Sequence, residues 1–223
     1  MEFNSISFLL FFAIVVVLYY NLNKRNRFIL LLISSFLFYS FWNWKYSFLL
    51  IISGITDYYV SKKIYESAIK KEKLIYLTIS IIVNLGLLIY FKYLIFITDN
   101  LNFFSESFGL GFNLDVLNIL LPFGISFYTF ETISYSVDVY RGILKPEKSF
   151  IKYALFVAFF PKLVAGPIQR ANEFLPQLKS KINFNSEIIF EGLKRILFGL
   201  FLKVVFADNI AGFVDDAYSY DFA

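Results

Sequence analysis

The sequence predicts an all-α, polytopic membrane protein with about six spans and one re-entrant segment broken by proline and glycine. Three observations predict it: an apolar composition, a series of long apolar runs, and basic residues concentrated in alternate loops. Of the 223 residues, 58% are hydrophobic and 17% are charged, whereas a soluble domain is roughly half apolar and a quarter charged. A domain of this length in water still exposes roughly 30% of its surface. A bilayer is therefore the simplest solvent for this chain.

Two residue types that the chain lacks exclude several kinds of site. The sequence contains no Cys and no His. A disulfide framework, a thiol nucleophile, the usual zinc sites and the usual proton shuttle at neutral pH are therefore excluded, and we expect no metal. The net charge of +4 is mostly accounted for by loops between the apolar runs, so we expect no nucleic-acid partner.

Six apolar runs are predicted to cross the membrane. The first lacks the basic N-terminal flank and the small-residue cleavage site of a signal peptide, so it is predicted to be a retained span. Residues 74–97 form the clearest run, because they exceed the roughly 20 residues needed to cross. Asp57 and Lys92 fall near the ends of runs, where an interfacial role is expected. The six runs are residues 3–22, 28–42, 46–60, 74–97, 119–140 and 196–206.

The distribution of charge sets the predicted orientation. The segment 98–118 contains Asp99, Glu106 and Asp115 but no Lys or Arg. Cytoplasmic loops are enriched in Lys and Arg, so this segment is predicted to lie outside, as is the N-terminus. The basic residues of the predicted inner loops are Lys24, Arg25, Arg27, Lys62, Lys63, Lys70, Lys71, Lys73, Arg141, Lys145, Lys148 and Lys152.

The apolar segment 153–168 does not read as a simple span. Both of its flanks are basic, so a re-entrant hairpin fits better than a crossing. Broken backbone at membrane depth is tolerated only against protein or a water-filled cavity, and we expect this segment to line a cavity. Its carbonyls and cations could bind an anionic group, such as the phosphates of a nucleotide-linked donor. The alternative is a turn at the inner interface whose cations contact lipid phosphates. The candidate residues here are Pro161, Lys162, Gly166, Pro167, Gln169 and Arg170.

Three further ionisable residues are candidates for the same cavity. Glu131 and Asp138 lie seven residues apart on one predicted helical face, where they could form the polar wall of a substrate channel. A charge in the middle of a span costs on the order of 2.5–3.5 kcal/mol on insertion scales, so it should face protein or water. The alternatives are an ion pair of Glu131 with Lys203 or Arg141, and simple proximity of Asp138 to the inner headgroups. Lys203 itself needs an acidic partner or a path to water.

Three sequence blocks occur in a fixed order over the second half of the chain. They read LPFGISFYTFE followed by SYSVDVYRG (residues 121–142), FFPKLVAGPIQR (159–170) and GLKRILFGLFLKVVFADN (192–209). Together they resemble the membrane-bound O-acyltransferase family, in its bacterial branch of alginate O-acetylation. The chain is interpreted as a single transmembrane domain, residues 1–223, with its signature region at residues 119–209.

The resemblance implies a multi-pass enzyme of the cytoplasmic (inner) membrane. Such an enzyme takes an acyl group from a thioester donor, acetyl-CoA or another acyl thioester. It passes the group to a hydroxyl of an exported polysaccharide such as alginate, directly or through an extracytoplasmic acetyltransferase partner. The resemblance also implies that residues 161–170 lie where the donor enters from the inner face, with Glu131 and Asp138 on a neighbouring helix. No bound cofactor is implied.

The chain departs from the family in one functional respect. The family's catalytic His lies downstream of these blocks, and this chain has no His. We therefore expect the N-terminal part of a longer domain, from a truncated or split reading frame, that is inactive alone and has a separate C-terminal half as a partner. A transporter or channel and a non-catalytic membrane scaffold are the alternative functions, because ionisable residues in spans and a broken segment also suit transporters.

Overall fold

In the computed structural model of the protein, every regular element in the part of the chain that it describes is a helix, which confirms the predicted all-α class. It describes residues 1–115, 120–164, 166–180 and 184–219. The chain divides into two compact units. The larger unit spans Leu22–Ser180, and the smaller unit combines Met1–Asn21 with Lys181–Ala223.

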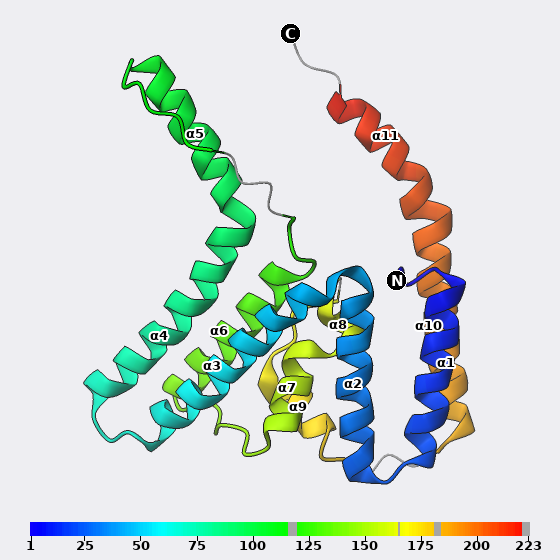
Figure 1. Ribbon diagram of the computed structural model, residues 1–223. Coiled ribbons are helices and arrows are strands. Elements are labelled where there is room, and N and C mark those ends of the chain that lie inside the picture. Colours follow the sequence, from blue (N-terminus) through cyan, green and yellow to red (C-terminus); the bar gives the residue numbers. More distant parts are fainter. Residues whose placement is uncertain (116–119, 165, 181–183, 220–223) are drawn as a thin grey trace. The chain divides into compact units, whose positions relative to one another are not determined.

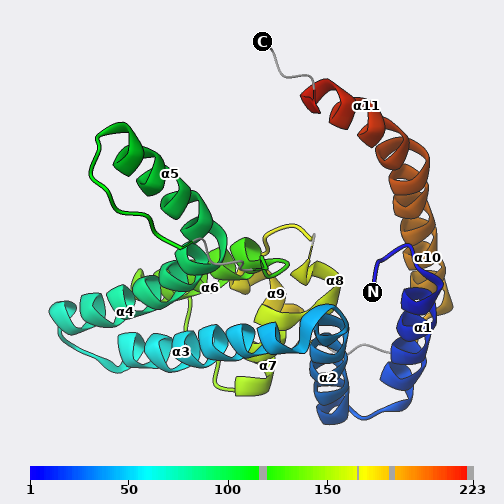
Figure 2. The same ribbon diagram turned by 45° about the horizontal axis from the view of Figure 1, so that its top comes forward.

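The larger unit contains helices α2 to α9 (Figure 1). Helices α3, α4 and α6 pack against one another, while α2 packs against α7 and α8. The α3, α4 and α6 group and the α7 to α9 group lie next to each other in both views (Figures 1 and 2). The bounds are α2 Lys24–Asn43, α3 Ser47–Glu66, α4 Lys70–Leu88, α5 Leu94–Ser107, α6 Ile125–Tyr140, α7 Phe150–Ala158, α8 Phe160–Leu163 and α9 Ala171–Gln177.

A sharp change of direction separates α2 from α3 (Figure 2), and α2 ends at Asn43. Asn43 has φ −159° and ψ 109°, which is extended rather than helical backbone. Its side-chain oxygen accepts a hydrogen bond from the backbone N–H of Lys45 at 3.1 Å. Asn is a preferred cap because its side chain satisfies such a free N–H group. The two apolar runs predicted on either side of this point therefore lie in two helices, α2 and α3, which meet at a bend within one helical stretch.

Helices α4 and α5 form one continuous stretch, Lys70–Ser107, of 38 residues. A π-helical turn, Ile89–Tyr93, joins them. The predicted span at residues 74–97 lies inside this stretch. The prediction of a loop from residue 98 is wrong for residues 98–107, which remain helical. Their polar side chains lowered the hydropathy of the sequence without interrupting the helix.

The smaller unit contains α1 (Ile6–Asn21), α10 (Ser186–Phe201) and α11 (Asp208–Ser219). A second π-helical turn, Leu202–Ala207, makes α10 and α11 one stretch of 34 residues. The predicted run at residues 196–206 covers only part of it. Within this stretch Lys203 pairs with Asp208, and both side chains are exposed, so the acidic partner expected for Lys203 is found.

Three helical stretches among the described residues are long and apolar enough to cross a membrane, judged by length and composition. Helix α1 is shorter but also apolar. The described part of the chain is therefore that of a helical membrane protein, while the arrangement of about six spans with one re-entrant segment stays a prediction. The three stretches are Lys24–Glu66, Lys70–Ser107 and Ser186–Ser219.

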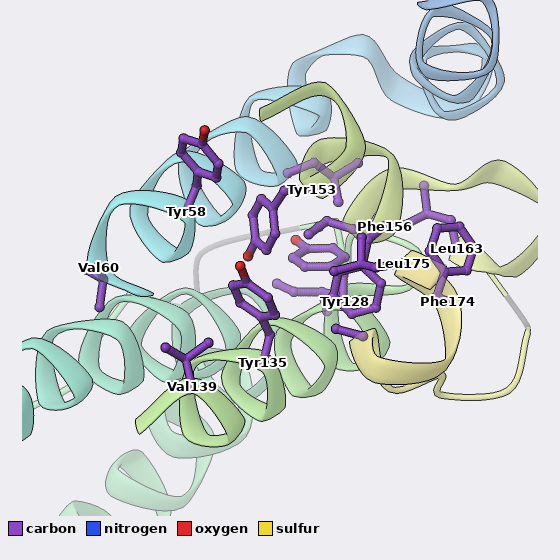
Figure 3. Packing of buried hydrophobic residues seen from close by; sticks show 14 of the residues in the cluster. Tyr58, Val60, Tyr128, Tyr135, Val139, Tyr153, Phe156, Leu163, Phe174 and Leu175 are labelled. Carbon is purple, nitrogen blue, oxygen red and sulfur yellow. The ribbon is translucent and has the colours of Figure 1, made fainter. Parts of the chain in front are cut away.

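A buried cluster of tyrosine and phenylalanine rings positions α7 against α3 and α6 (Figure 3). The centroid of the Tyr153 ring lies 4.7 Å from that of Tyr135 and 5.7 Å from that of Tyr58. Phe156 extends the cluster, 6.2 Å from the Tyr135 ring. The Tyr135 hydroxyl accepts a hydrogen bond from the backbone N–H of Glu147 at 2.8 Å. Because α8 follows α7 directly, this cluster also sets the position of the broken segment.

A buried polar cluster joins α3, α4 and α6. Asp57 is fully buried, and its carboxylate accepts hydrogen bonds from Asn84 Nδ2 (2.6 Å), from Ser136 Oγ (3.0 Å) and from Ser80 Oγ. The amide oxygen of Asn84 accepts from Ser53 Oγ at 2.5 Å. The interfacial role expected for Asp57 is therefore wrong. Helix α3 continues to Glu66, which places Asp57 in its middle rather than near its end.

We predict that Asp57→Leu lowers the free energy of unfolding of the larger unit by about 3 kcal/mol or more. The substitution removes the acceptor of two buried hydroxyl groups and of one amide hydrogen of Asn84, and each such loss costs about 1–3 kcal/mol. Asp57→Asn should cost less, because its amide oxygen can still accept. Thermal unfolding in detergent measures the effect, with Asp99→Leu on the exposed face of α5 as the control. Equal midpoints for Asp57→Leu and the unmodified chain would contradict the prediction.

Candidate functional site

The break predicted in the apolar segment 153–168 is present and begins at Phe159. Phe159 has φ −59° and ψ 109°, which ends α7 and starts the short helix α8. Pro161 lies in the first turn of α8, where a missing N–H group removes no helical hydrogen bond. The N–H group of Phe160 is instead satisfied by Ser35 Oγ on α2, at 3.1 Å. The break therefore lies against protein.

Two glycines allow the backbone around the break to pack closely. A Cβ atom on Gly166 would lie 2.4 Å from Cα of Lys162, and its N–H group donates to the Lys162 carbonyl at 3.0 Å. A Cβ atom on Gly124, which has φ +74°, would lie 2.2 Å from the carbonyl oxygen of Leu163. Only glycine fits both positions. The start of α6 consequently contacts the end of α8.

Glu131 and Lys162 form a buried ion pair between α6 and α8. The Nζ atom of Lys162 lies 2.6 Å from Oε2 of Glu131, and the side chains are 6% and 5% exposed, respectively. The other oxygen, Oε1, accepts a hydrogen bond from the backbone N–H of Gln169 at 3.1 Å. One carboxylate thus fixes two points of the broken segment. Glu131 therefore pairs with Lys162, and not with Lys203 or Arg141, the two alternative partners expected from the sequence.

Aromatic rings enclose the cation of this pair. The Nζ atom of Lys162 lies 4.4 Å from the ring centroid of Phe156 and 5.1 Å from that of Phe174. Cation–π contacts of this kind are strongest where water is excluded. The charge of Lys162 is therefore engaged inside the protein, whereas the side chain of Arg170 on the same segment is exposed. Of these two cations, Arg170 is the one that faces solvent.

The structure brings together only part of the predicted residue set. Glu131, Lys162, Gly166 and Gln169 meet at one point. Pro161, Pro167 and Arg170 lie on the same segment with exposed side chains. Lys203 belongs to the smaller unit. No group of three or more acidic side chains in the described ranges could hold a metal ion.

Asp138 is buried in the last turn of α6, two turns beyond Glu131. Its backbone carbonyl accepts hydrogen bonds from the N–H groups of Ile143 and Leu144, at 2.9 and 3.2 Å. These bonds tie the chain that leaves α6 to its last turn. Glu131 and Asp138 are both buried, which agrees with the prediction that they lie on one face of the helix.

The sequence did not lead us to predict that the polar residues around Asp57 form a buried cluster. A signal for it exists in the sequence. Ser53, Asp57 and Ser61 are spaced by four residues, which places them on one face of a helix, and all three are fully buried. Small hydroxyl side chains on both sides of an acid in an apolar helix indicate a hydrogen-bonded carboxylate.

Comparison with known proteins identifies relatives of the whole chain. It is 38% identical, over 98% of its length, to the probable alginate O-acetylase AlgI of Pseudomonas aeruginosa. The chain belongs to the membrane-bound O-acyltransferase family. This confirms the resemblance of the three sequence blocks. No protein-family model and no solved structure matches the chain.

Two other members of the membrane-bound O-acyltransferase family show how far the relationship extends. The peptidoglycan O-acetyltransferase of Helicobacter pylori is 37% identical over 83% of this chain. The teichoic acid D-alanyltransferase of Bacillus subtilis is 25% identical over 40% of it. The chain spans about two fifths of the curated relatives it matches, 42% of the Pseudomonas protein and 39% of the Helicobacter protein.

We predict that removing one partner of the buried ion pair is much worse than removing both charges. Lys162→Met leaves the Glu131 carboxylate buried without a counter-charge, which costs about 3–5 kcal/mol of unfolding free energy. The double variant Glu131→Gln with Lys162→Met should recover most of that loss. A double-mutant cycle by denaturation in detergent measures the coupling. The exposed pair Glu191 and Lys194 is the matched control and should show little coupling; additive effects at the buried pair would contradict the prediction.

We also predict that Gly124→Ala destabilises the contact of α6 with α8. The new methyl group would overlap the Leu163 carbonyl, and φ +74° is strained for alanine. Gly86→Ala in α4 is the matched control, because no atom lies within 4 Å of the added Cβ; it should leave stability unchanged or raise it by up to about 1 kcal/mol. Thermal unfolding midpoints compare the two. Equal midpoints would show that α6 and α8 do not approach so closely.

Proposed function

We propose that the chain is part of an O-acetyltransferase of the cell inner membrane that acts on an exported polysaccharide such as alginate. The acetyl group comes from a thioester donor on the cytoplasmic side. The names of relatives aligned with nearly the whole chain support an O-acetyltransferase. One observation supports a donor-binding role for this chain. The Pro/Gly segment is held in a fixed position, because the carboxylate of Glu131 binds both Lys162 and the backbone of Gln169.

The donor's phosphates bind the exposed end of this segment. Glu131 already neutralises Lys162 inside the protein, so Lys162 holds the segment in place rather than binding an anion. Arg170, whose side chain is exposed, supplies the cation. Its planar guanidinium group suits a phosphate, because it donates two parallel hydrogen bonds. Pro167 and Gly166 keep the neighbouring backbone irregular, with carbonyls available to the rest of the donor.

Chemistry at the acceptor needs a group that this chain does not provide. Transfer of an acetyl group to a hydroxyl requires a base for the hydroxyl proton. The sequence has no His, and the Glu131 carboxylate is committed to Lys162 and Gln169. The chain is therefore the donor-binding part of the enzyme and is inactive alone. The family's catalytic His lies beyond the three sequence blocks, so the base for the acceptor comes from outside residues 1–223, and an extracytoplasmic acetyltransferase receives the acetyl group.

The proposed orientation follows from the loops. The N-terminus lies outside, the chain crosses about six times, and residues 153–168 enter and leave on the inner face. The basic loops before α2 and between α3 and α4 then lie in the cytoplasm, as the positive-inside rule requires. Arg170 lies at the same inner face, where a cytoplasmic thioester can reach it.

Titration of the purified chain in nanodiscs with acetyl-CoA tests the proposal. We expect binding, and we expect Arg170→Gln to weaken it by roughly 10- to 100-fold, because a charge-assisted hydrogen bond is worth about 1.5–3 kcal/mol. Lys145→Gln, another exposed cation between α6 and α7, is the matched control and should bind normally. The same preparation should transfer no acetyl group to alginate oligomers.

Each outcome separates the alternatives. Absence of acetyl-CoA binding would overturn the donor role. Measurable acetyl transfer by the chain alone would overturn its predicted inactivity. Solute or ion flux through liposomes that contain the chain, without binding of acetyl-CoA, would favour a transporter or channel.

A further inference from the structure

The end of α5 and the residues that follow it form a fixed lobe, residues 98–115, called here the α5 lobe. Two side chains of α5 clamp the returning backbone. Asn102 Nδ2 donates to the Leu114 carbonyl at 2.9 Å, and Asn102 Oδ1 accepts from the Leu114 N–H at 2.7 Å. Ser105 Oγ donates to the Phe112 carbonyl at 2.5 Å and accepts from its N–H at 3.1 Å. These hydrogen bonds hold the returning backbone against α5, so the lobe has a defined surface.

This lobe presents large apolar side chains to its surroundings. Phe103 is 66% exposed and Phe108 is 70% exposed. A hollow of about 540 Å³ lies beside Phe112, and its other lining residues are polar or glycine: Asn102, Ser105, Glu106, Gly109, Gly111 and Asn113. The exposed apolar residues of the lobe also include Leu101, Phe104, Leu110, Phe112 and Leu114. Exposed apolar groups around a hollow are typical of an interaction site.

The helical stretch of α4 and α5 is longer than the hydrocarbon core is thick, so the lobe at its end lies outside the core. The stretch Lys70–Ser107 has 38 residues, roughly 57 Å at 1.5 Å per residue, against about 30 Å of hydrocarbon core. With Lys73 at one headgroup region, about 20 residues reach Tyr93 at the other. Tyr and Lys are common at such interfaces. Figures 1 and 2 show α5 continuing away from α3 and α6, so the lobe extends beyond the membrane surface.

The negative charge of the lobe indicates which kind of partner can bind to it. Residues 98–115 contain Asp99, Glu106 and Asp115 but no Lys or Arg. Anionic headgroups would be repelled by these carboxylates. A protein face with an apolar centre and a rim of Lys and Arg matches both the apolar side chains and the charge, because complementary potentials favour association.

We propose that the α5 lobe is the docking surface for a protein on the outer side of the membrane, one that presents an apolar side chain surrounded by Lys and Arg. This rests on the proposed function, in which an acetyl group is passed outward to a second protein. The apolar side chain of the partner packs on the exposed rings of Phe108 and Phe112, and its basic rim pairs with Glu106, which lines the hollow, and with Asp115. The lobe then holds the acceptor protein at a fixed distance from the membrane.

Site-specific photocrosslinking in intact cells tests the docking surface. A benzophenone amino acid replaces Phe108 in the full chain, and the matched control replaces Ile82, which is 65% exposed in the middle of α4. We expect Phe108 to crosslink one secreted protein through a Lys- and Arg-rich segment, and Ile82 to crosslink lipid. The double charge reversal Glu106→Lys with Asp115→Lys should lower the yield by roughly tenfold. Crosslinks to lipid alone, to a second copy of the chain or at a yield unaffected by the reversal would overturn the proposal.

Two single cysteines separate this proposal from the proposed function. The chain has no Cys, so Ser107→Cys and Ala68→Cys each introduce one thiol at an exposed position. A membrane-impermeant maleimide should label Ser107→Cys but not Ala68→Cys in intact cells. The reverse pattern would overturn the orientation and the docking surface together. Binding of acetyl-CoA without a Phe108 crosslink to protein would overturn the docking surface and leave the donor role standing.

Discussion

The ion pair of Glu131 with Lys162 is the interaction on which the candidate site depends. Moving two charges out of water costs several kcal/mol for each ion, and their attraction offsets this only when the geometry is good and the remaining polar positions are satisfied. Both conditions are met here, by the 2.6 Å contact and by the N–H group of Gln169. The described part of the broken segment is bound to Glu131 at two points, through Lys162 and through the N–H group of Gln169. It therefore takes its position from this carboxylate on α6.

The ion pair and the close backbone packing support each other. Lys162 reaches Glu131 only because Gly166 leaves room beside its Cα atom and because Gly124 lets α6 approach the Leu163 carbonyl. A side chain at either glycine would push α8 away from α6. A longer distance would leave two buried charges poorly compensated, which is the most costly arrangement for a charge in protein. Sterics and electrostatics thus select the same backbone arrangement.

The sequence predicted what depends on neighbouring residues and missed what depends on packing between distant segments. Apolar runs predicted the helices, and proline and glycine predicted the break, because each effect is local. The partner of Glu131 is 31 residues away, and no periodicity shows that α8 folds back on α6. Asp57 was misplaced because the polar end of α3, residues 61–66, has low hydropathy although it is helical. Residues 98–107 of α5 misled the prediction for the same reason.

Helix α6 connects the two buried polar centres of the larger unit. Its residue Glu131 faces α8, while Thr132 and Ser136 reach Asn84 and Asp57 on α4 and α3. The second centre is built from neutral donors around one carboxylate, so it fixes how three helices cross without adding a second charge pair. A shift of α6 would break hydrogen bonds in both centres. The broken segment is therefore positioned by the whole helix bundle, and the donor-binding role proposed for it needs that rigidity.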